Sequence, residues 1–222
     1  MSFYLGLDLG QAADYTAIAV LERRDLNAPV SPPEWRIPFR GERPEMPAPD
    51  LAFDCRHLKR LPLNTSYPAV ADHVTGLLES PQLVGQTKLV VDATGVGRPV
   101  VDLLKERGLR PVPVTITGGD KVTFENGWRV PKRDLVGAVQ VLLQTDRIKF
   151  AEKIPEVPTL VRELLAFRVK IDPLTAHDSY GAGAWREGAH DDLVLAVAIA
   201  AWWARRSAPD DPRPYTIMKA RP

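Results

Sequence analysis

The chain has 222 residues, a length that suits a single domain with a sizeable hydrophobic core. Its formal net charge is only +1, so no overall electrostatic field attracts it to nucleic acid or to a membrane surface, and such binding would need local basic patches. The one cysteine, Cys55, excludes an internal disulfide and disfavours a cysteine-ligated zinc site, and the N-terminus lacks an export signal, so we expect a cytoplasmic protein.

An aspartate interrupts the first apolar stretch of the chain. Residues 3–9 and 16–21 predict two largely buried strands of a hairpin, and Asp8 lies on the first of them. Burying an unpaired carboxylate is costly, so Asp8 requires a cation, a metal ion or hydrogen-bond donors. The alternative is that Asp8 only stabilises the turn that follows the strand.

The rest of the first half predicts an antiparallel meander and one helix. Residues 27–50 contain seven prolines, which favours an exposed excursion with one short strand, at 35–39, as its only regular element. A third strand is expected at 51–61, where it would complete the meander with the first two. An amphipathic helix is expected at 67–78.

The second half predicts parallel strands and further helices. The later elements are expected at these positions: a strand at 87–91, a helix ending at Gly108, a strand at 110–116, a hairpin at 122–130, a helix from Pro131 to about Thr145, a short strand at 146–150, a helix at 159–167, a loop at 170–188 and a final helix that follows Asp191 and Asp192. The crossover between 87 and 116 implies parallel pairing. The apolar run at 193–204 is too short to cross a bilayer and predicts a buried helix.

These elements predict an α/β fold: a mixed sheet, with an antiparallel meander first and parallel strands after it, and with helices on both faces. The folded domain should span residues 1–206. Residues 207–222, rich in proline and charge, are expected to form a flexible tail.

Asp8 lies on the first predicted strand, Asp92 follows the strand at 87–91, and Asp191 and Asp192 precede the final helix. If the strands at 3–9 and 87–91 are neighbours, Asp8 and Asp92 can lie side by side, and a final helix packed on the sheet can bring Asp191 and Asp192 over them. Clustered carboxylates stay ionised only when a multivalent cation neutralises them, and oxygen ligands alone select magnesium or manganese.

Each of these residues also has a purely structural interpretation. Asp92 could serve the turn before Gly95, and the pair Asp191 and Asp192 could cap the final helix and complement its dipole. His190 is interpreted as a cap or as a donor to a metal ligand rather than as a ligand itself. The joint occurrence of the acidic positions favours the metal site.

Three motifs in this order resemble one family. They are GLDLG at 6–10 followed by Asp14, VVDATG at 90–95 and HDDLVLA at 190–196. The chain resembles, over about residues 3–204, the nuclease domain of the large terminase subunits of tailed phages, which has the ribonuclease H-like fold. The motif PKRDL at 131–135 and the residues Glu163, Leu164 and Phe167 also resemble that family.

The resemblance implies a DNA endonuclease that uses two magnesium or manganese ions. The implied catalytic and metal-binding residues are Asp8, shared between the ions, Asp92 on one ion, and Asp191 or Asp192 completing the set, with Asp14 and His190 as accessory groups. Two ions about 4 Å apart would activate a water and stabilise the leaving oxygen of a phosphodiester.

The resemblance also sets expectations about partners. The sequence contains no GKS or GKT phosphate loop for a packaging ATPase, so we expect either an excised domain or a free-standing relative. The expected partners are DNA and other phage packaging proteins or a separate ATPase, in a bacterial host or encoded by a prophage, with no membrane. The substrate form is left open between linear duplex, branched DNA and RNA.

Binding to DNA requires positive charge near the acidic residues. The preferred candidates are Lys121, Arg129, Lys132 and Arg133, on the predicted hairpin and the start of the helix after it. Each of them, taken singly, could be an ordinary solvated side chain.

Three other interpretations of the sequence compete with a nuclease. An actin-like or sugar kinase-type ATP-binding protein opens with a motif similar to the one around Asp8, but a second aspartate and glycine phosphate motif is missing. A dinucleotide-binding fold would place a third glycine where Val100 stands. A non-catalytic ribonuclease H-like DNA-binding module would keep the fold without the chemistry.

Overall fold

The structure, a computed structural model, describes residues 2–10, 14–27, 50–95, 97–170 and 191–207. The strands are β1 Ser2–Asp8, β2 Ala17–Asp25, β3 Leu51–Arg60, β4 Thr87–Asp92, β5 Val112–Thr117, β6 Thr123–Phe124, β7 Trp128–Pro131 and β8 Ile148–Phe150. The helices are α1 Tyr67–Leu78, α2 Gly97–Glu106, α3 Lys132–Gln144, α4 Val157–Lys170 and α5 Asp192–Arg206.

The strands form one mixed sheet in the order β6-β7-β5-β4-β1-β2-β3-β8. β1, β2 and β3 pair antiparallel, as the meander predicts, whereas β4 joins β1 in parallel and is followed by β5 and β7, also in parallel. The predicted α/β fold class is therefore confirmed. β8 pairs in parallel with β3 at the far edge of the sheet.

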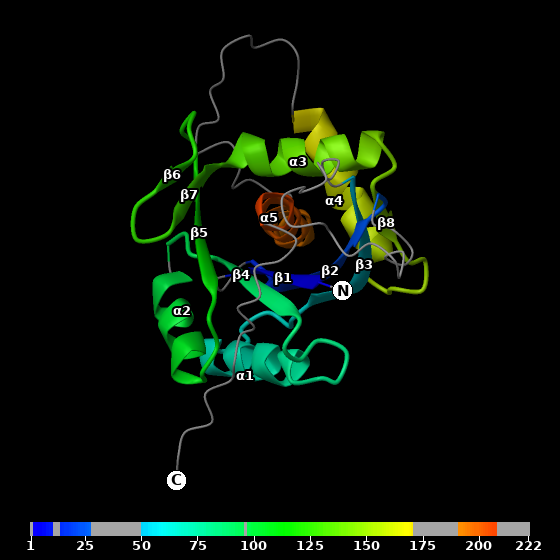
Figure 1. The fold of residues 1–222 in the computed structure, drawn as a ribbon. Helices are drawn as coiled ribbons and strands as arrows, with labels where there is room; N and C mark the ends of the chain where they lie inside the picture. The colour runs from blue at the N-terminus through cyan, green and yellow to red at the C-terminus, as the bar shows by residue number, and fades with distance from the viewer. Residues whose placement is uncertain (1, 11–13, 28–49, 96, 171–190, 208–222) are drawn as a thin grey trace, which may run out of the picture.

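Helices cover both faces of this sheet (Figure 1). On one face α5 packs on the central strands, with α3 and α4 outside it, and the large side chains of this core include Tyr4, Phe53 and Leu193. On the other face α1 and α2 cover Leu5, Leu7 and the alternate residues of β4. Strand residues alternate between the two cores because successive side chains point to opposite faces.

Helix α5 is buried along nearly its whole length, which confirms the buried helix predicted from the apolar run. Near its C-terminus, Trp202 and Trp203 lie 5.8 and 5.9 Å from the ring of Trp128, measured between ring centroids. This contact attaches the β6–β7 hairpin to the helix. Within the described part of the chain, no helix is long and apolar enough to cross a membrane.

Several predicted boundaries differ from the structure: β2 extends to Asp25, beyond the expected end at residue 21, and β5 and β8 each begin two residues later than expected. Pro131 ends β7, pairs with Thr117 and has an extended ψ of 134°, so it precedes α3 and is not its first residue. Helix α4 begins two residues before the predicted start and continues to Lys170. The predicted strand at 35–39, nearly all of the loop at 170–188 and the tail after residue 207 lie outside the described residues.

Candidate active site

Asp8 and Asp92 stand at the ends of two neighbouring parallel strands. Leu7 of β1 pairs with Val91 of β4, so the aspartates that follow lie at the same level of the sheet. Both belong to the face that α5 covers, because they alternate with Leu7 and Val91, whose side chains lie in the opposite core. They are buried, with 7% and 9% of their surfaces exposed, and their carboxyls share a hydrogen bond. The sequence predicts this adjacency on the condition that the two strands are neighbours, and the pairing of β1 with β4 meets that condition.

The start of α5 adds two more carboxyl groups. Asp192 is the first residue of the helix and is buried, and Asp191 stands at the N-cap position without a side-chain bond to the helix. The charges of both residues act on Asp8. The four predicted acidic residues therefore converge on the same end of the sheet.

Burial and mutual repulsion change the titration of this cluster. Burial, and then the charges of Asp92, Asp192 and Asp191, raise the pKa of the Asp8 carboxyl well above its ordinary value. Burial also raises the pKa of Asp92, although the backbone amide and the hydroxyl of Thr94 both donate to its Oδ1, at 2.8 and 2.5 Å, and oppose the shift. A proton between Asp8 and Asp92 thus relieves repulsion that a bound cation would also relieve.

Basic side chains contact the other two aspartates. Nζ of Lys132, at the start of α3, lies 2.7 Å from Oδ2 of Asp191, and Nη2 of Arg60 lies 3.3 Å from Oδ2 of Asp192. Among the described residues, no group of three or more His, Cys, Asp or Glu side chains is arranged closely enough to hold a metal ion as it stands. The aspartates of α5 are engaged by cations instead.

A fifth carboxylate belongs to the same network. Glu163 of α4 is 5% exposed, accepts a hydrogen bond from the backbone nitrogen of Val194 at 3.0 Å and contacts the guanidinium of Arg60. The sequence indicates Glu163 only through the family resemblance and indicates no role in the site for Arg60. The available signal was the position of Glu163 three residues after the buried Leu160, on the apolar side of its helix.

The remaining predicted residues that the structure describes are Asp14, Lys121, Arg129 and Arg133. Asp14 is exposed in the connection between β1 and β2, and His190 falls outside the described residues. Lys121 and Arg129 are exposed on and beside the β6–β7 hairpin. Arg133 contacts the backbone oxygen and the carboxylate of Asp120, at 2.9 and 3.0 Å.

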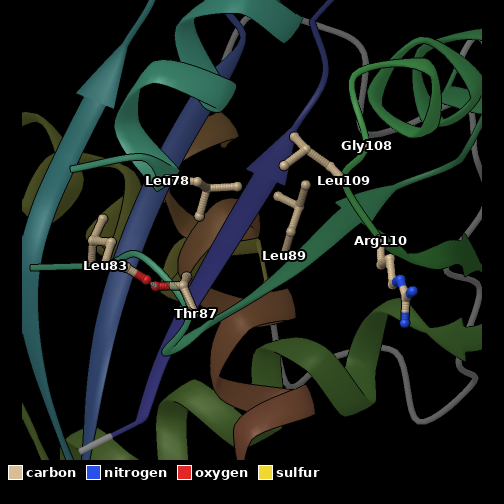
Figure 2. A pocket seen from close by; sticks show the side chains of 8 residues that line it. Leu78, Leu83, Thr87, Leu89, Gly108, Leu109 and Arg110 are labelled. Carbon is tan, nitrogen blue, oxygen red and sulfur yellow. Dashed lines mark hydrogen bonds between the residues drawn. The ribbon is translucent and has the colours of Figure 1, made fainter. Parts of the chain in front are cut away.

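A small pocket lies at the opposite end of β4 and is separate from the acidic cluster. Figure 2 shows its side chains, which come from Leu78, Leu83, Thr87, Leu89, Leu109 and Arg110. Thr87 begins β4 and Asp92 ends it, a separation of about 16 Å at the usual rise of a strand. Four of its eight lining residues are leucines and none is acidic, so the acidic cluster does not extend into it.

The site predicts how stability depends on pH in the absence of metal. Burial raises the pKa of Glu163 from 4.5 to about 7, although the Val194 amide and the Arg60 guanidinium lower it. A group whose pKa rises on folding contributes stability that is complete below its unfolded pKa and is lost as the pH rises through the folded value. In chelator, the fall in thermal midpoint between pH 5 and pH 8 should therefore be smaller in Glu163→Gln than in the unaltered chain. Equal falls in the two proteins would contradict this assignment.

Known proteins resemble this chain in structure but not in sequence. The chain matches no model of a known protein family and no curated protein sequence. Among solved structures it is similar to the large terminase nuclease from thermophilic phage G20c, with a TM-score of 0.51 and 17% sequence identity over 90% of this chain and 80% of that chain. It is also similar to the human cytomegalovirus terminase nuclease domain soaked with Mn, with a TM-score of 0.48 and 14% identity over 94% of this chain and 84% of that chain. The chain therefore has the fold of the large terminase nuclease from phage G20c, and the resemblance predicted from the sequence is confirmed at the level of the fold.

Proposed function

We propose that the chain is a divalent-metal-dependent endonuclease that cleaves DNA by a two-metal mechanism. The observation that supports it most strongly is the convergence of Asp8, Asp92, Asp191 and Asp192 at one end of a sheet with a terminase nuclease fold. The charges in this cluster repel one another and raise the pKa of Asp8. A structural role alone gives no reason to gather four acidic side chains at one place.

The residues present fit hard cations. The donors are carboxylate oxygens, which prefer Mg²⁺ or Mn²⁺ to softer metals. Asp8 and Asp92 would hold the ions together with Asp191 or Asp192, once one of these exchanges its basic partner for metal. When bound, the ions would supply an activated water and stabilise the leaving oxygen of the phosphodiester. Asp14 and His190 remain predicted accessory groups.

The chain's own residues prepare this site. Thr94 orients the carboxylate of Asp92 through two hydrogen bonds, and the backbone nitrogen of Ile116 donates to the Thr94 hydroxyl at 2.8 Å. Strand β5 thus holds in place the group that orients Asp92. Lys132, which contacts Asp191, would be able to face a phosphate oxygen when metal takes its place on that carboxylate.

The broader assignment follows from the same proposal. The nuclease domain would span residues 1–206 and the tail residues 207–222, with DNA as the substrate. Other phage packaging proteins or a separate ATPase would be the partners, in the cytoplasm of a bacterial host.

A plasmid-nicking assay tests the proposed activity. We expect nicking with Mg²⁺ or Mn²⁺, none with Zn²⁺ alone, and none after exhaustive chelation, because the ligands are hard oxygens. Restoring Mn²⁺ after chelation should restore the activity, which controls for damage by the chelator. Cleavage that persists in chelator would refute the two-metal proposal.

DNA binding should depend on the exposed cations of the β6–β7 hairpin. We expect the double variant Lys121→Ala/Arg129→Ala to weaken DNA binding and to reduce the slope of log affinity against log salt by about 1–2, because each lost phosphate contact removes about 0.9. Lys132→Ala and Arg133→Ala should also weaken binding, although both side chains contact aspartates in the free protein.

A matched control lies at the other edge of the sheet. Lys149 of β8 is exposed at that edge. Lys149→Ala should leave both the affinity for DNA and the salt slope unchanged. An unaltered slope in the double variant of Lys121 and Arg129 would move the DNA-binding surface away from the hairpin.

A further inference from the structure

A network of charged side chains joins β3, α4 and α5 beside the candidate active site. Arg60, the last residue of β3, contacts Glu163 through Nη2, and the same nitrogen lies 3.3 Å from Oδ2 of Asp192. Its guanidinium also lies over the ring of Tyr15, 4.8 Å from the ring centroid. One guanidinium is therefore shared between a proposed metal ligand and a carboxylate that lies outside the proposed ligand set.

The two oxygens of Glu163 have different partners. Oε1 contacts Arg60, whereas Oε2 accepts the hydrogen bond from the backbone nitrogen of Val194 in the first turn of α5. The residue is nearly fully buried, so water does not compete for either oxygen. Glu163 thus holds both the helix that begins at Asp192 and the cation that contacts Asp192.

We propose that Glu163 is a positioning residue that holds Arg60 and so keeps this guanidinium from occupying the Asp192 carboxylate fully. The inference rests on the proposed function, since it takes Asp192 as a metal ligand. A guanidinium and a divalent cation compete for the same carboxylate, so the affinity of the site for metal depends on how strongly Glu163 retains Arg60. Replacing a group that orients a metal ligand typically lowers metal affinity about 10–100-fold.

Calorimetric titration with Mn²⁺ at pH 8 tests this role. Glu163→Gln keeps an oxygen for the Val194 amide but loses the charge that holds Arg60, and we expect the Mn²⁺ affinity to fall about tenfold or more. Arg60→Met removes the competing cation. In the double variant Arg60→Met/Glu163→Gln the affinity should therefore return to within about threefold of the Arg60→Met value, as expected for residues that act through one another.

Glu22 provides a matched control. It is also a buried glutamate paired with an arginine of β3, with Nε of Arg56 2.6 Å from its Oε2, but it pairs with Phe3 at the other end of β1 from Asp8. Glu22→Gln should leave Mn²⁺ affinity unchanged. Thermal midpoints of all variants in chelator separate loss of stability from loss of metal affinity, and a purely structural Glu163 would not produce rescue by Arg60→Met.

Each outcome decides the inference. Unchanged Mn²⁺ affinity in Glu163→Gln, or a double variant as weak as Glu163→Gln, would overturn it and leave the proposed function standing. An unaltered chain that does not bind Mn²⁺ would overturn both. If Glu163→Gln does not fold, Arg60→Met decides alone: Mn²⁺ affinity equal to or above that of the unaltered chain supports the inference, and a tenfold loss, on the scale of the orienting groups above, overturns it.

Discussion

Asp8→Asn should abolish metal-dependent cleavage while leaving the metal-free protein as stable as before or more stable. We expect the cleavage rate to fall by a factor on the order of 10³ or more, since the proposed shared ligand of both ions is lost. Stability should survive because the asparagine amide can donate to Asp92 as the protonated carboxyl does, and because one charge leaves a buried, repulsive cluster.

The thermal midpoints of the unaltered chain and of Asp8→Asn, with and without Mg²⁺, test the predicted stabilities, and a cleavage assay tests the loss of activity. Mg²⁺ should raise the midpoint of the unaltered chain and not that of Asp8→Asn. Asp102→Asn, an exposed aspartate of α2, serves as the control and should behave as the unaltered chain. If Asp8 only stabilised a turn, its replacement would instead cost about 1 kcal/mol or more in chelator, and Mg²⁺ would stabilise neither protein.

The acidic cluster could be predicted because it depends on backbone order alone. An aspartate at the end of each of two apolar strands, and a pair of them before an apolar helix, specify which elements carry the carboxyl groups. Once β1 and β4 are neighbours, Asp8 and Asp92 must meet, and a helix as apolar as α5 has to lie on the sheet. Asp191 stands at the N-cap position and Asp192 in the first turn, as the structural interpretation places them, but the carboxylate of Asp191 contacts Lys132 and makes no hydrogen bond to the helix.

The cationic part of the site could not be predicted in the same way. Lys132 reaches Asp191 across 59 positions of sequence, and Arg60 reaches Glu163 across 103. Such contacts depend on the direction of long side chains between elements that pair only in three dimensions. The position of β8 beside β3 escaped prediction for a related reason, since three residues carry too short a pattern to specify an edge.

Gly6 allows α5 to lie as close to β1 as it does. A Cβ atom added at Gly6 would stand 2.0 Å from the carbonyl oxygen of Ala196 and 3.1 Å from Cβ of Ala200, so the strand and the helix backbone are in direct contact there. Gly6 also pairs with β2 and β4, in the middle of the sheet, so neither partner can move away freely. The same close approach carries Asp192 toward Asp8.

Gly6→Ala should therefore destabilise the protein severely. We expect a loss of about 3 kcal/mol or more, since backbone must shift to admit the methyl group, and a drop in thermal midpoint of roughly 6–12 °C for a domain of this size. Gly137→Ala is the matched control: its Cβ meets nothing within 4 Å in the interior of α3, so alanine should stabilise that helix by about 0.5–1 kcal/mol. Because α5 would be displaced from β1, Gly6→Ala should also weaken Mn²⁺ binding, whereas Gly137→Ala should not. A Gly6→Ala protein with an unaltered midpoint would mean that α5 does not pack against β1 at this distance, and the juxtaposition of Asp8 with Asp192 would lose its structural basis.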